Sequence, residues 1–598
     1  MRCGADTGGT FTDVVADDGR VVKVLSTPDD PSRAVGEGLS DLLDGGRPDL
    51  LAHGTTVATN ALLERRGARV ALMTNAGFAD VIEIARQDRP SLYDITVDRP
   101  EPLVPRDLRL EVGGRLDADG TELEALDPAT VPEMPDGVES VAVCLLHADL
   151  DGGHEQAVAG VLAERGVDDV SCSHEVSPEF REYERTVTTV VNAYLRPRCR
   201  RYIRALSGLA GEVLVMTSAG GLLPADEAAE LAVALLLSGP AGGARAGALA
   251  AAAAGFGDAV TFDMGGTSTD VCLVRGGAPE PAPGRTAAGF PIRLPALDIH
   301  TIGAGGGSIA RLDPGGALAV GPESAGADPG PACYGQGGAR PTVTDADLVL
   351  DRIPAGTTFG GLRPLDRVAA ERALDEANVD ATGVVQVVDA AMERAVRAVS
   401  VECGVDPSGL ALVAFGGAGP LHACAVAEGA GIAAVVVPPR AGVLSAVGLL
   451  CSPRQRDLVR SWPTPGDHEG IDEARRELAV QARRAVGGDS GDAEVTTSVD
   501  CRYAGQSHEL TVARMDDFAG EHRRRNGYAR PGAPVEIVAL RAQARREPAV
   551  TIEDLGPPPT PRSATNGPAV VAEPDCTVWV PEGWRADVAA DGSWVLTR

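Results

Sequence analysis

A nine-residue segment occurs twice in this chain and restricts the folds that the chain can adopt. DTGGTFTDV at residues 6–14 returns as DMGGTSTDV at residues 263–271, and seven of the nine positions are identical. Each copy adjoins short apolar or alternating runs and glycine-bearing turns, a pattern typical of a β-hairpin. Repetition of one such unit at this separation predicts a duplicated domain with one hairpin in each half.

The residues of the repeat suit phosphate binding. Paired glycines let backbone N–H groups converge on an anion without a Cβ in the way, and threonine hydroxyls add donors on the same hairpin. Carboxylates cannot bind phosphate directly, but they hold Mg²⁺ through water, and the metal contacts the phosphate oxygens. The alternative is a hairpin turn made only of good turn formers. Two matching copies weaken that alternative, because turning a chain does not require the same carboxylates and hydroxyls twice.

Lysine is almost absent, and this excludes two classes of enzyme. Lys23 is the one lysine among 54 basic residues. A P-loop needs lysine directly after its glycines, and a pyridoxal phosphate enzyme needs lysine for its Schiff base. Lys23 lies instead in the apolar run VVKV at residues 21–24, so neither class fits.

Chain length and charge set further limits. A chain of 598 residues exceeds what one hydrophobic core accommodates, so we expect two or three domains. The formal net charge of −31 opposes contact with nucleic acid or anionic membranes. The eleven cysteines include no C-x-x-C pair, which argues against structural zinc or a disulfide framework. With no signal peptide and no apolar run long enough to span a bilayer, we expect a cytoplasmic protein.

These motifs and several further segments resemble those of a known family. The paired D-x-G-G-T motifs are similar to the two phosphate loops of the actin, sugar kinase and heat-shock ATPase superfamily. Further segments resemble hydantoinase A, the amino-terminal half of 5-oxoprolinase, and the nucleotide-binding subunit of acetone carboxylase. These segments are HGTTVATNALLE at 53–64, SPEFREYER at 177–185, SGPAGG at 238–243, GAGGGS at 303–308 and FGGAGP at 415–420. The resemblance implies an α/β fold with duplicated actin/hexokinase-like (RNase H-like) nucleotide-binding domains.

The resemblance also implies a set of site residues. Asp6 and Asp263 would bind Mg²⁺ through water, with Asp263 near the γ-phosphate of ATP, while Asp13 and Asp270 would hold the hairpins together. Gly416 and Gly417 lie between a strand-like run and a helix start and would support the adenosine. The alternative is an ordinary loop between a strand and a helix that needs glycine for close packing. The phosphates would be held by Gly8, Gly9, Thr10, Thr12, Gly265, Gly266, Thr267 and Thr269.

Several other residues are weaker candidates. Gly305 lies in a glycine-rich loop that would either contact an anion or remain a flexible loop lining the cleft. His53, followed by Thr55, Thr56 and Asn60, would face the substrate or the γ-phosphate as a catalytic residue, or would be only a hydrogen-bonded loop residue. His300, His422, Asp298 and Asp345 are lesser candidates for the site.

The same residues suggest domain limits. The first actin-like unit would occupy residues 1–185 and the second residues 186–455. After residue 455 a helical pattern at 471–485 precedes alternating runs at 495–499 and 510–512, so we expect a small α+β C-terminal domain over 456–598.

The resemblance implies ATP-dependent hydrolysis of a cyclic amide, of the 5-oxoproline or hydantoin type, by phosphorylation of the carbonyl oxygen. The chain would be the ATP-binding subunit of a hetero-oligomer, with a separate hydantoinase B-like partner. One alternative is an ATP-dependent ketone carboxylase subunit, because the same phosphate clamp serves both reactions. Another is a non-catalytic actin-like ATPase that switches partners or polymerises.

Overall fold

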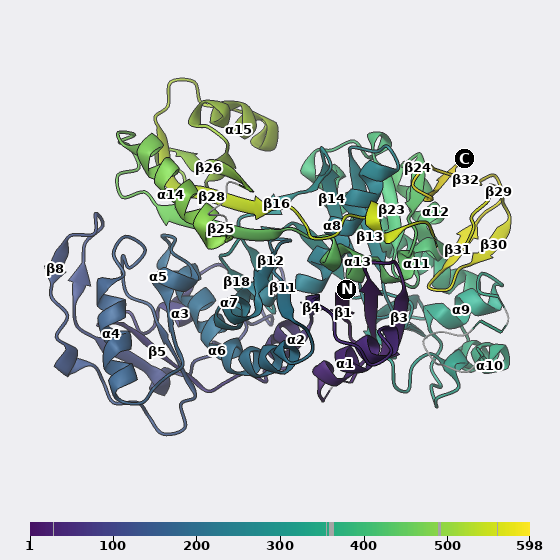
Figure 1. Cartoon of the computed structure of the whole chain (residues 1–598), viewed down its shortest axis with the longest axis horizontal. Helices are drawn as coiled ribbons and strands as arrows, with labels where there is room; N and C mark the ends of the chain where they lie inside the picture. The colour runs from purple at the N-terminus through teal and green to yellow at the C-terminus, as the bar shows by residue number, and fades with distance from the viewer. Residues whose placement is uncertain (28, 355, 358–363, 488–491, 559) are drawn as a thin grey trace.

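Two large mixed sheets organise the chain (Figure 1). The computed structural model describes residues 1–27, 29–354, 356–357, 364–487, 492–558 and 560–598. The first sheet runs in the order β27-β26-β28-β25-β12-β11-β4-β1-β2-β3, and the second runs β15-β14-β13-β23-β24-β33-β32-β29, with β20 also paired to β14. We call each sheet with its covering helices a lobe.

Five strands at one end of the first sheet are matched by five strands in the second. In the first lobe they are β3 (Val21–Leu25), β2 (Phe11–Ala16), β1 (Arg2–Thr7), β4 (Leu50–Thr55) and β11 (Glu212–Met216). In the second lobe they are β15 (Ala278–Pro279), β14 (Thr269–Arg275), β13 (Ala259–Met264), β23 (Ala411–Phe415) and β24 (Ala434–Val437). Both sets begin with three antiparallel strands and end with two parallel additions. The repeated segments form the β1–β2 and β13–β14 hairpins, which confirms the two predicted hairpins.

Helices cover these sheets and bury two separate cores. In the first lobe α1 (Pro31–Leu42) and α6 (Glu182–Ser207) pack against the sheet, and in the second α11 (Ala381–Val399) and α12 (Gly419–Ala430) do so. A third unit, at the left of Figure 1, is inserted between β4 and β11. Its sheet is β10 (Val170–Cys172), β9 (Ser140–Val143), β5 (Val70–Asn75) and β6 (Arg109–Val112), with α4 (Gly153–Glu164) against it.

Two helices cross where the lobes meet. α8 (Ser238–Ala253) follows β12 (Leu222–Pro224) and leads into β13, while α13 (Leu444–Leu450) follows β24 and leads into β25 (Arg454–Ser461). A Cβ placed on Gly448 of α13 would lie 2.0 Å from the carbonyl oxygen of Gly242 in α8. Glycine is therefore required at Gly448 for the two backbones to pack this closely.

The region after residue 454 is divided between the lobes. The strands β25, β28 (Val535–Arg546), β26 (Ala493–Tyr503) and β27 (Leu510–Val512) extend the first sheet, and α14 (Ile471–Ala485) and α15 (Phe518–Asn526) accompany them around a small core. The strands β29 (Thr565–Asn566), β32 (Arg585–Val588) and β33 (Trp594–Thr597) join the second sheet. The helix expected at 471–485 is confirmed, but the region expected as one domain over 456–598 supplies strands to both large sheets. The limit expected at 185/186 falls inside α6.

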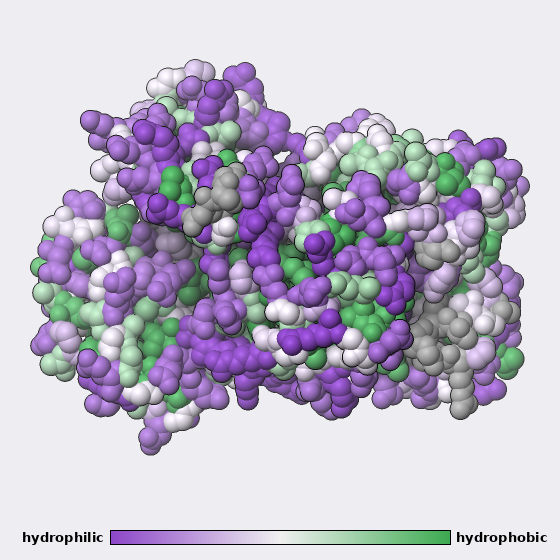
Figure 2. All heavy atoms as spheres, viewed as in Figure 1, coloured by the Kyte–Doolittle hydropathy of each residue, from purple (hydrophilic) through white to green (hydrophobic). Residues whose placement is uncertain are grey.

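The chain passes from one lobe to the other three times: through α8, through α13, and through the segment between β28 and β29. The face shown in Figure 2 is covered mainly by hydrophilic residues with scattered apolar ones. Among the described residues, none of the helices has the length and apolarity that a membrane span needs.

Candidate active site

Each hairpin carries a row of side chains that ends in paired carboxylates. In the first lobe the register aligns Lys23, Asp13, Asp6 and Gly54 across β3, β2, β1 and β4. In the second it aligns Thr301, Asp270, Asp263 and Phe415 across β20 (Ile299–Ile302), β14, β13 and β23. We call these the first and second carboxylate rows. Residues opposite one another on adjacent strands lie on the same face, so each aspartate pair points to one side of its sheet.

The two rows lie close enough to repel one another. The pKa of Asp6 is raised to about 7, first by burial and then by the charges of Asp13 and Asp270, which outweigh the opposing charge of Lys23. The pKa of Asp263 is also raised to about 7, first by burial, then by Asp270 and by the two aspartates of the first row. Burial raises the pKa of Asp270 to about 6. Each row therefore responds to the charges of the other, and both rows lie against α8, where a Cβ on Gly239 would be 3.4 Å from Asp6 Oδ1 and one on Gly243 3.1 Å from Asp263 Oδ2.

The tips of the two hairpins are open. Each turn is closed by one backbone hydrogen bond, from Gly8 N to Phe11 O and from Gly265 N to Ser268 O, both 3.0 Å long. Gly9 and Gly266 are exposed, and a Cβ placed on Gly266 would lie 3.9 Å from Thr10 Oγ1. The structure therefore brings Gly8, Gly9, Thr10, Gly265, Gly266 and Thr267 to two facing loops with accessible backbone.

Thr12 and Thr269 have other partners than the expected phosphates. Thr12 Oγ1 lies 3.1 Å from Ser26 Oγ, and Thr269 Oγ1 donates to Ala304 O at 2.7 Å. Both side chains are buried. Each follows the strand alternation, which turns it away from the face that carries its neighbouring aspartate. The two hydroxyls therefore fix each hairpin to the loop beside it, whereas we expected them to contact phosphate.

The loop of Gly305 supports the second hairpin. Gly306 N donates to Gly265 O at 3.0 Å and Gly307 N donates to Gly266 O at 2.6 Å, while Gly305 N donates to Ser308 Oγ at 2.8 Å. Because these N–H groups already have protein acceptors, they are not free to bind an anion in this arrangement. In this arrangement the loop supports the second hairpin, and the anion contact expected at Gly305 stays a prediction.

Gly416 and Gly417 lie directly beside Asp263. Gly416 has φ +80°, and a Cβ placed on it would come 2.4 Å from Asp263 Oδ1 and 2.5 Å from Met264 O. Gly417 is exposed and has no heavy atom within 4 Å of its Cβ position. Helix α12 begins two residues later, so an open backbone turn and a helix N-terminus meet at the second hairpin.

His53 does not reach the site. It is fully buried in β4, and its Nε2 lies 2.7 Å from Tyr202 Oη of α6. Its neighbour Gly54, not His53 itself, stands in the row of Asp6. Burial lowers the pKa of His53 to about 4, so the ring is neutral at physiological pH. This geometry favours the expected alternative of a hydrogen-bonded residue over the catalytic role.

The lesser candidates have structural contacts or solvent exposure. His422 is buried between Asp389 and Asp347, with its Nδ1 and Nε2 at 2.7 Å and 3.1 Å from their carboxylate oxygens. Asp345 caps helix α9 (Val343–Val349) and accepts from Cys333 N at 2.8 Å. His300 and Asp298 are exposed.

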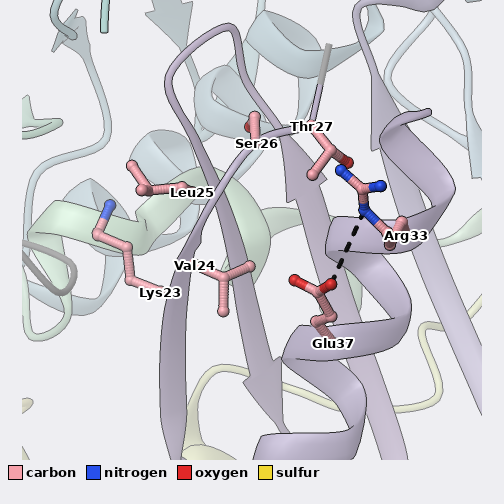
Figure 3. A pocket seen from close by; sticks show the side chains of 7 residues that line it. All are labelled: Lys23, Val24, Leu25, Ser26, Thr27, Arg33 and Glu37. Atoms are coloured by element: carbon pink, nitrogen blue, oxygen red, sulfur yellow. Dashed lines mark ion pairs between the residues drawn. The ribbon is translucent and has the colours of Figure 1, made fainter. Parts of the chain in front are cut away.

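Two contacts at the site were missed by sequence reasoning. Ser445 of α13 donates from Oγ to Asp263 Oδ2 at 3.0 Å. Lys23 pairs with Asp13 at 2.6 Å, and it also lines a surface hollow of about 580 Å³ with Ser26, Thr27, Arg33 and Glu37 (Figure 3). This hollow lies beside the first hairpin, not between the two loops. A signal for Lys23 was available: it is the single lysine and lies within ten residues of a candidate metal-binding motif.

The carboxylate rows fit a divalent cation held through water. Within the described parts of the chain, two groups of residues have ligand atoms close enough together to bind an ion directly. One is Glu155, Cys172 and His174, and the other is Glu573, Asp575 and Cys576. Asp6 and Asp263 are in neither group, so among the described residues they are not part of a set of three or more ligand atoms that could hold an ion directly. Half-buried carboxylates that repel one another across a gap favour a hydrated cation, which Mg²⁺ prefers.

Comparison with known proteins places this chain in a family. The Hydantoinase/oxoprolinase family matches residues 185–457, and the Hydantoinase/oxoprolinase N-terminal region matches residues 2–166. The chain is 34% identical to caprolactamase subunit alpha of Pseudomonas jessenii, over 100% of this chain and 99% of that protein. The crystal structure of ATP-dependent caprolactamase from Pseudomonas jessenii superposes with a TM-score of 0.86 at 32% identity, and all of both chains is covered.

Two further relatives differ in how much of their length is matched. The chain is 33% identical to 5-oxoprolinase 1 of Arabidopsis thaliana over 86% of this chain and 46% of that protein. It is 33% identical to the acetophenone carboxylase gamma subunit of Aromatoleum aromaticum over 84% of this chain and 76% of that protein. The fold and the site thus define a mixed α/β protein with two hairpin-bearing lobes. The chain belongs to the hydantoinase/oxoprolinase family.

Proposed function

We propose that this chain is the ATP-binding subunit of an enzyme that phosphorylates the carbonyl oxygen of a cyclic amide and so permits its hydrolysis. We infer further that the lobes are duplicated actin-like nucleotide-binding units. The matching strand order and hairpin register of the two lobes support that inference. The observation that carries the proposal is the meeting of two carboxylate rows and two open glycine-threonine loops at one site.

The chemistry needs activation because a cyclic amide is stabilised by resonance. In the proposed reaction the carbonyl oxygen attacks the γ-phosphorus of ATP, ADP leaves, and the product is an imidate phosphate. Water then adds to the carbon, and the ring C–N bond breaks to leave an amine and an acyl phosphate. A second water hydrolyses the acyl phosphate to a carboxylate and free phosphate. The substrate oxygen is itself the nucleophile, so no serine or cysteine nucleophile is required.

The residues of the chain act by positioning and by charge. The open tips at Gly8, Gly9, Thr10, Gly265, Gly266 and Thr267 would bind the phosphates through backbone N–H groups and hydroxyls. Mg²⁺, when bound, would neutralise charge on the transferring phosphate. Asp6 and Asp263 would hold its waters, and Ser445 would fix the orientation of Asp263. Gly416 and Gly417 would let the adenosine approach the backbone beside Asp263.

The substrate class rests on the caprolactamase relative. It matches this chain from end to end in both sequence and structure, and its name specifies a cyclic amide. We therefore propose a lactam, a hydantoin or 5-oxoproline as the substrate in preference to a ketone. A carboxylase subunit remains a second candidate, because the acetophenone carboxylase gamma subunit is also a relative.

A hydantoinase B-like partner subunit is the second part of the proposal. The relative from Pseudomonas jessenii is named as a subunit, and this chain matches less than half of 5-oxoprolinase 1. One segment has the character of a contact surface: Leu92, Tyr93 and Ile95 are 76%, 97% and 89% exposed. Clustered large apolar side chains in water favour association with another protein.

ADP release by the chain co-expressed with a hydantoinase B-like subunit tests the function. We expect release that depends on a cyclic amide and not on bicarbonate, and no release from Asp263→Asn. Release from a ketone that requires bicarbonate would establish the carboxylase instead. Leu92→Ser combined with Tyr93→Ser should weaken co-purification of the partner, whereas Leu123→Ser, at another exposed position, should not.

A further inference from the structure

Lys23 contacts both lobes. From β3 of the first lobe its Nζ lies 2.6 Å from Asp13 Oδ1 and donates to Gly442 O of the second lobe at 3.4 Å. The Nζ also lies 5.1 Å from the centroid of the Phe11 ring, which orients the side chain. The side chains of Lys23 and Asp13 are 22% and 17% exposed, so solvent screens this pair less than it screens a surface ion pair.

The loop that Lys23 contacts is fixed to the first lobe at a second point. Arg440 donates from Nε to Gly19 O at 3.0 Å, in the turn between β2 and β3. Gly442 N in turn donates to Asp575 Oδ2 at 2.8 Å. The β2–β3 hairpin therefore holds residues 440–442 from both ends, and this short segment leads directly into α13.

Helix α13 carries the contact onward to the second carboxylate row. Ser445 lies three residues after Gly442, and its hydroxyl donates to Asp263 Oδ2 at 3.0 Å. One ammonium thus holds Asp13 directly and, through a three-residue segment, sets the position of the hydroxyl that holds Asp263. The second row has no cation in the corresponding place, because Thr301 is the residue aligned with Asp270.

We propose that Lys23 is a positioning residue that couples the two carboxylate rows, so that a hydrated divalent cation and its nucleotide bind only when both lobes are in register. This inference rests on the proposed function, and it assigns to one residue the alignment of the two lobes at that site. A compact ammonium suits the task because it offers three donors in any direction, whereas the planar guanidinium of arginine has a fixed fork. Every other basic residue of the chain is arginine.

The test compares Lys23→Met, Lys23→Arg and Ser445→Ala with wild type, using the full chain. Arg33→Gln is the matched control, because Arg33 lines the same hollow but is 61% exposed and pairs only weakly with Glu37, at 3.8 Å. Calorimetric titration measures the affinity for a nonhydrolysable ATP analogue and the Mg²⁺ concentration for half-saturation. We expect Lys23→Met to weaken analogue binding at least tenfold and to raise the Mg²⁺ requirement, Lys23→Arg to recover part of the loss, and Arg33→Gln to bind as wild type.

The double variant separates coupling from a local effect. If Lys23 acts through Ser445, the losses from Lys23→Met and Ser445→Ala combine to less than their product. Independent, multiplying losses would overturn the coupling, and wild-type affinity in Lys23→Met would overturn any role for Lys23. Failure of the wild-type chain to bind the analogue would refute the proposed function itself, and the inference with it.

A second measurement is made on the wild-type protein, and a variant is used only to assign its signals. Reductive methylation with ¹³C-formaldehyde labels the amino terminus and this single lysine, and Lys23→Arg identifies which NMR signal belongs to Lys23. We expect the dimethyl-lysine signal to shift when Mg²⁺ and the analogue are added together, and to shift less with the analogue alone. An unchanged signal at saturating ligand would refute the proposal.

Discussion

Gly416→Ala tests the argument that backbone geometry sets the approach to Asp263. An alanine at φ +80° costs about 1–2 kcal/mol relative to glycine. The new Cβ would also lie 2.4 Å from Asp263 Oδ1 and 2.5 Å from Met264 O, and the second atom belongs to the backbone and cannot turn aside. Overpacking of this kind costs roughly 1–3 kcal/mol. We therefore expect the variant to lose about 2–5 kcal/mol of unfolding free energy.

Gly417→Ala is the matched control for this prediction. Its Cβ would meet no heavy atom within 4 Å, so its stability should stay within about 0.5 kcal/mol of wild type. Chemical denaturation in the absence of ligand compares the three proteins, and titration with the ATP analogue then compares their affinities. A loss of affinity in Gly417→Ala without a loss of stability would place the nucleotide at this turn. Equal stability of the two alanine variants would refute the geometric reasoning.

Three further predictions concern charge and packing. Asp263→Asn should be more stable than wild type in metal-free buffer at pH 8. The pKa of Asp263 is about 7 in the folded protein and near 4 in the unfolded chain, so wild-type stability falls as pH rises between these values. Calorimetry at pH 5 and pH 8 checks this, and the same dependence of stability on pH in both proteins would contradict it. Burial disfavours the charged form of His422, but the carboxylates of Asp347 and Asp389 outweigh burial and raise the pKa of His422 to about 10. The stability that this charged histidine contributes is therefore complete below its pKa in the unfolded chain, near 6.5, and disappears as pH rises through 10. His422→Gln should cost about 3–5 kcal/mol at pH 7 in denaturation experiments, with little loss expected at pH 10.5. Gly448→Ala should prevent correct folding or lower the melting temperature sharply, whereas Gly160→Ala, on an open face of α4, should be neutral or stabilising. Scanning calorimetry separates these outcomes. Similar melting temperatures for both variants would argue against the close helix crossing.

Local patterns in the sequence predicted the local structure well. Helix α14 begins and ends at the residues that the periodicity indicated, and β27 does the same. The strand before Gly416 and the helix after it were also confirmed. These elements depend on the order of apolar and polar residues within one segment, which a sequence displays directly.

The expectations for Thr12 and His53 depend on the direction of a side chain. Each of these residues adjoins a member of the first carboxylate row, and the period of two in a strand turns both away from it. Strict use of that alternation would have placed both side chains off the face that carries the aspartates. The partners of Gly305 could not be predicted, because they depend on which loop packs against the second hairpin. The division of residues 456–598 between two sheets likewise depends on strand pairing across the whole chain.

The three passages of the chain between the lobes constrain how the molecule can move. A break in any one passage leaves the lobes tied by the other two, so a single proteolytic nick there should not release a fragment under native conditions. If the gene were split after β12, the amino-terminal half would lack the strands β25, β26, β27 and β28 of its own sheet. Where Gly242 and Gly448 meet, a side chain larger than hydrogen would have to push the two helices apart, so a substitution there would also shift the lobes that these helices join.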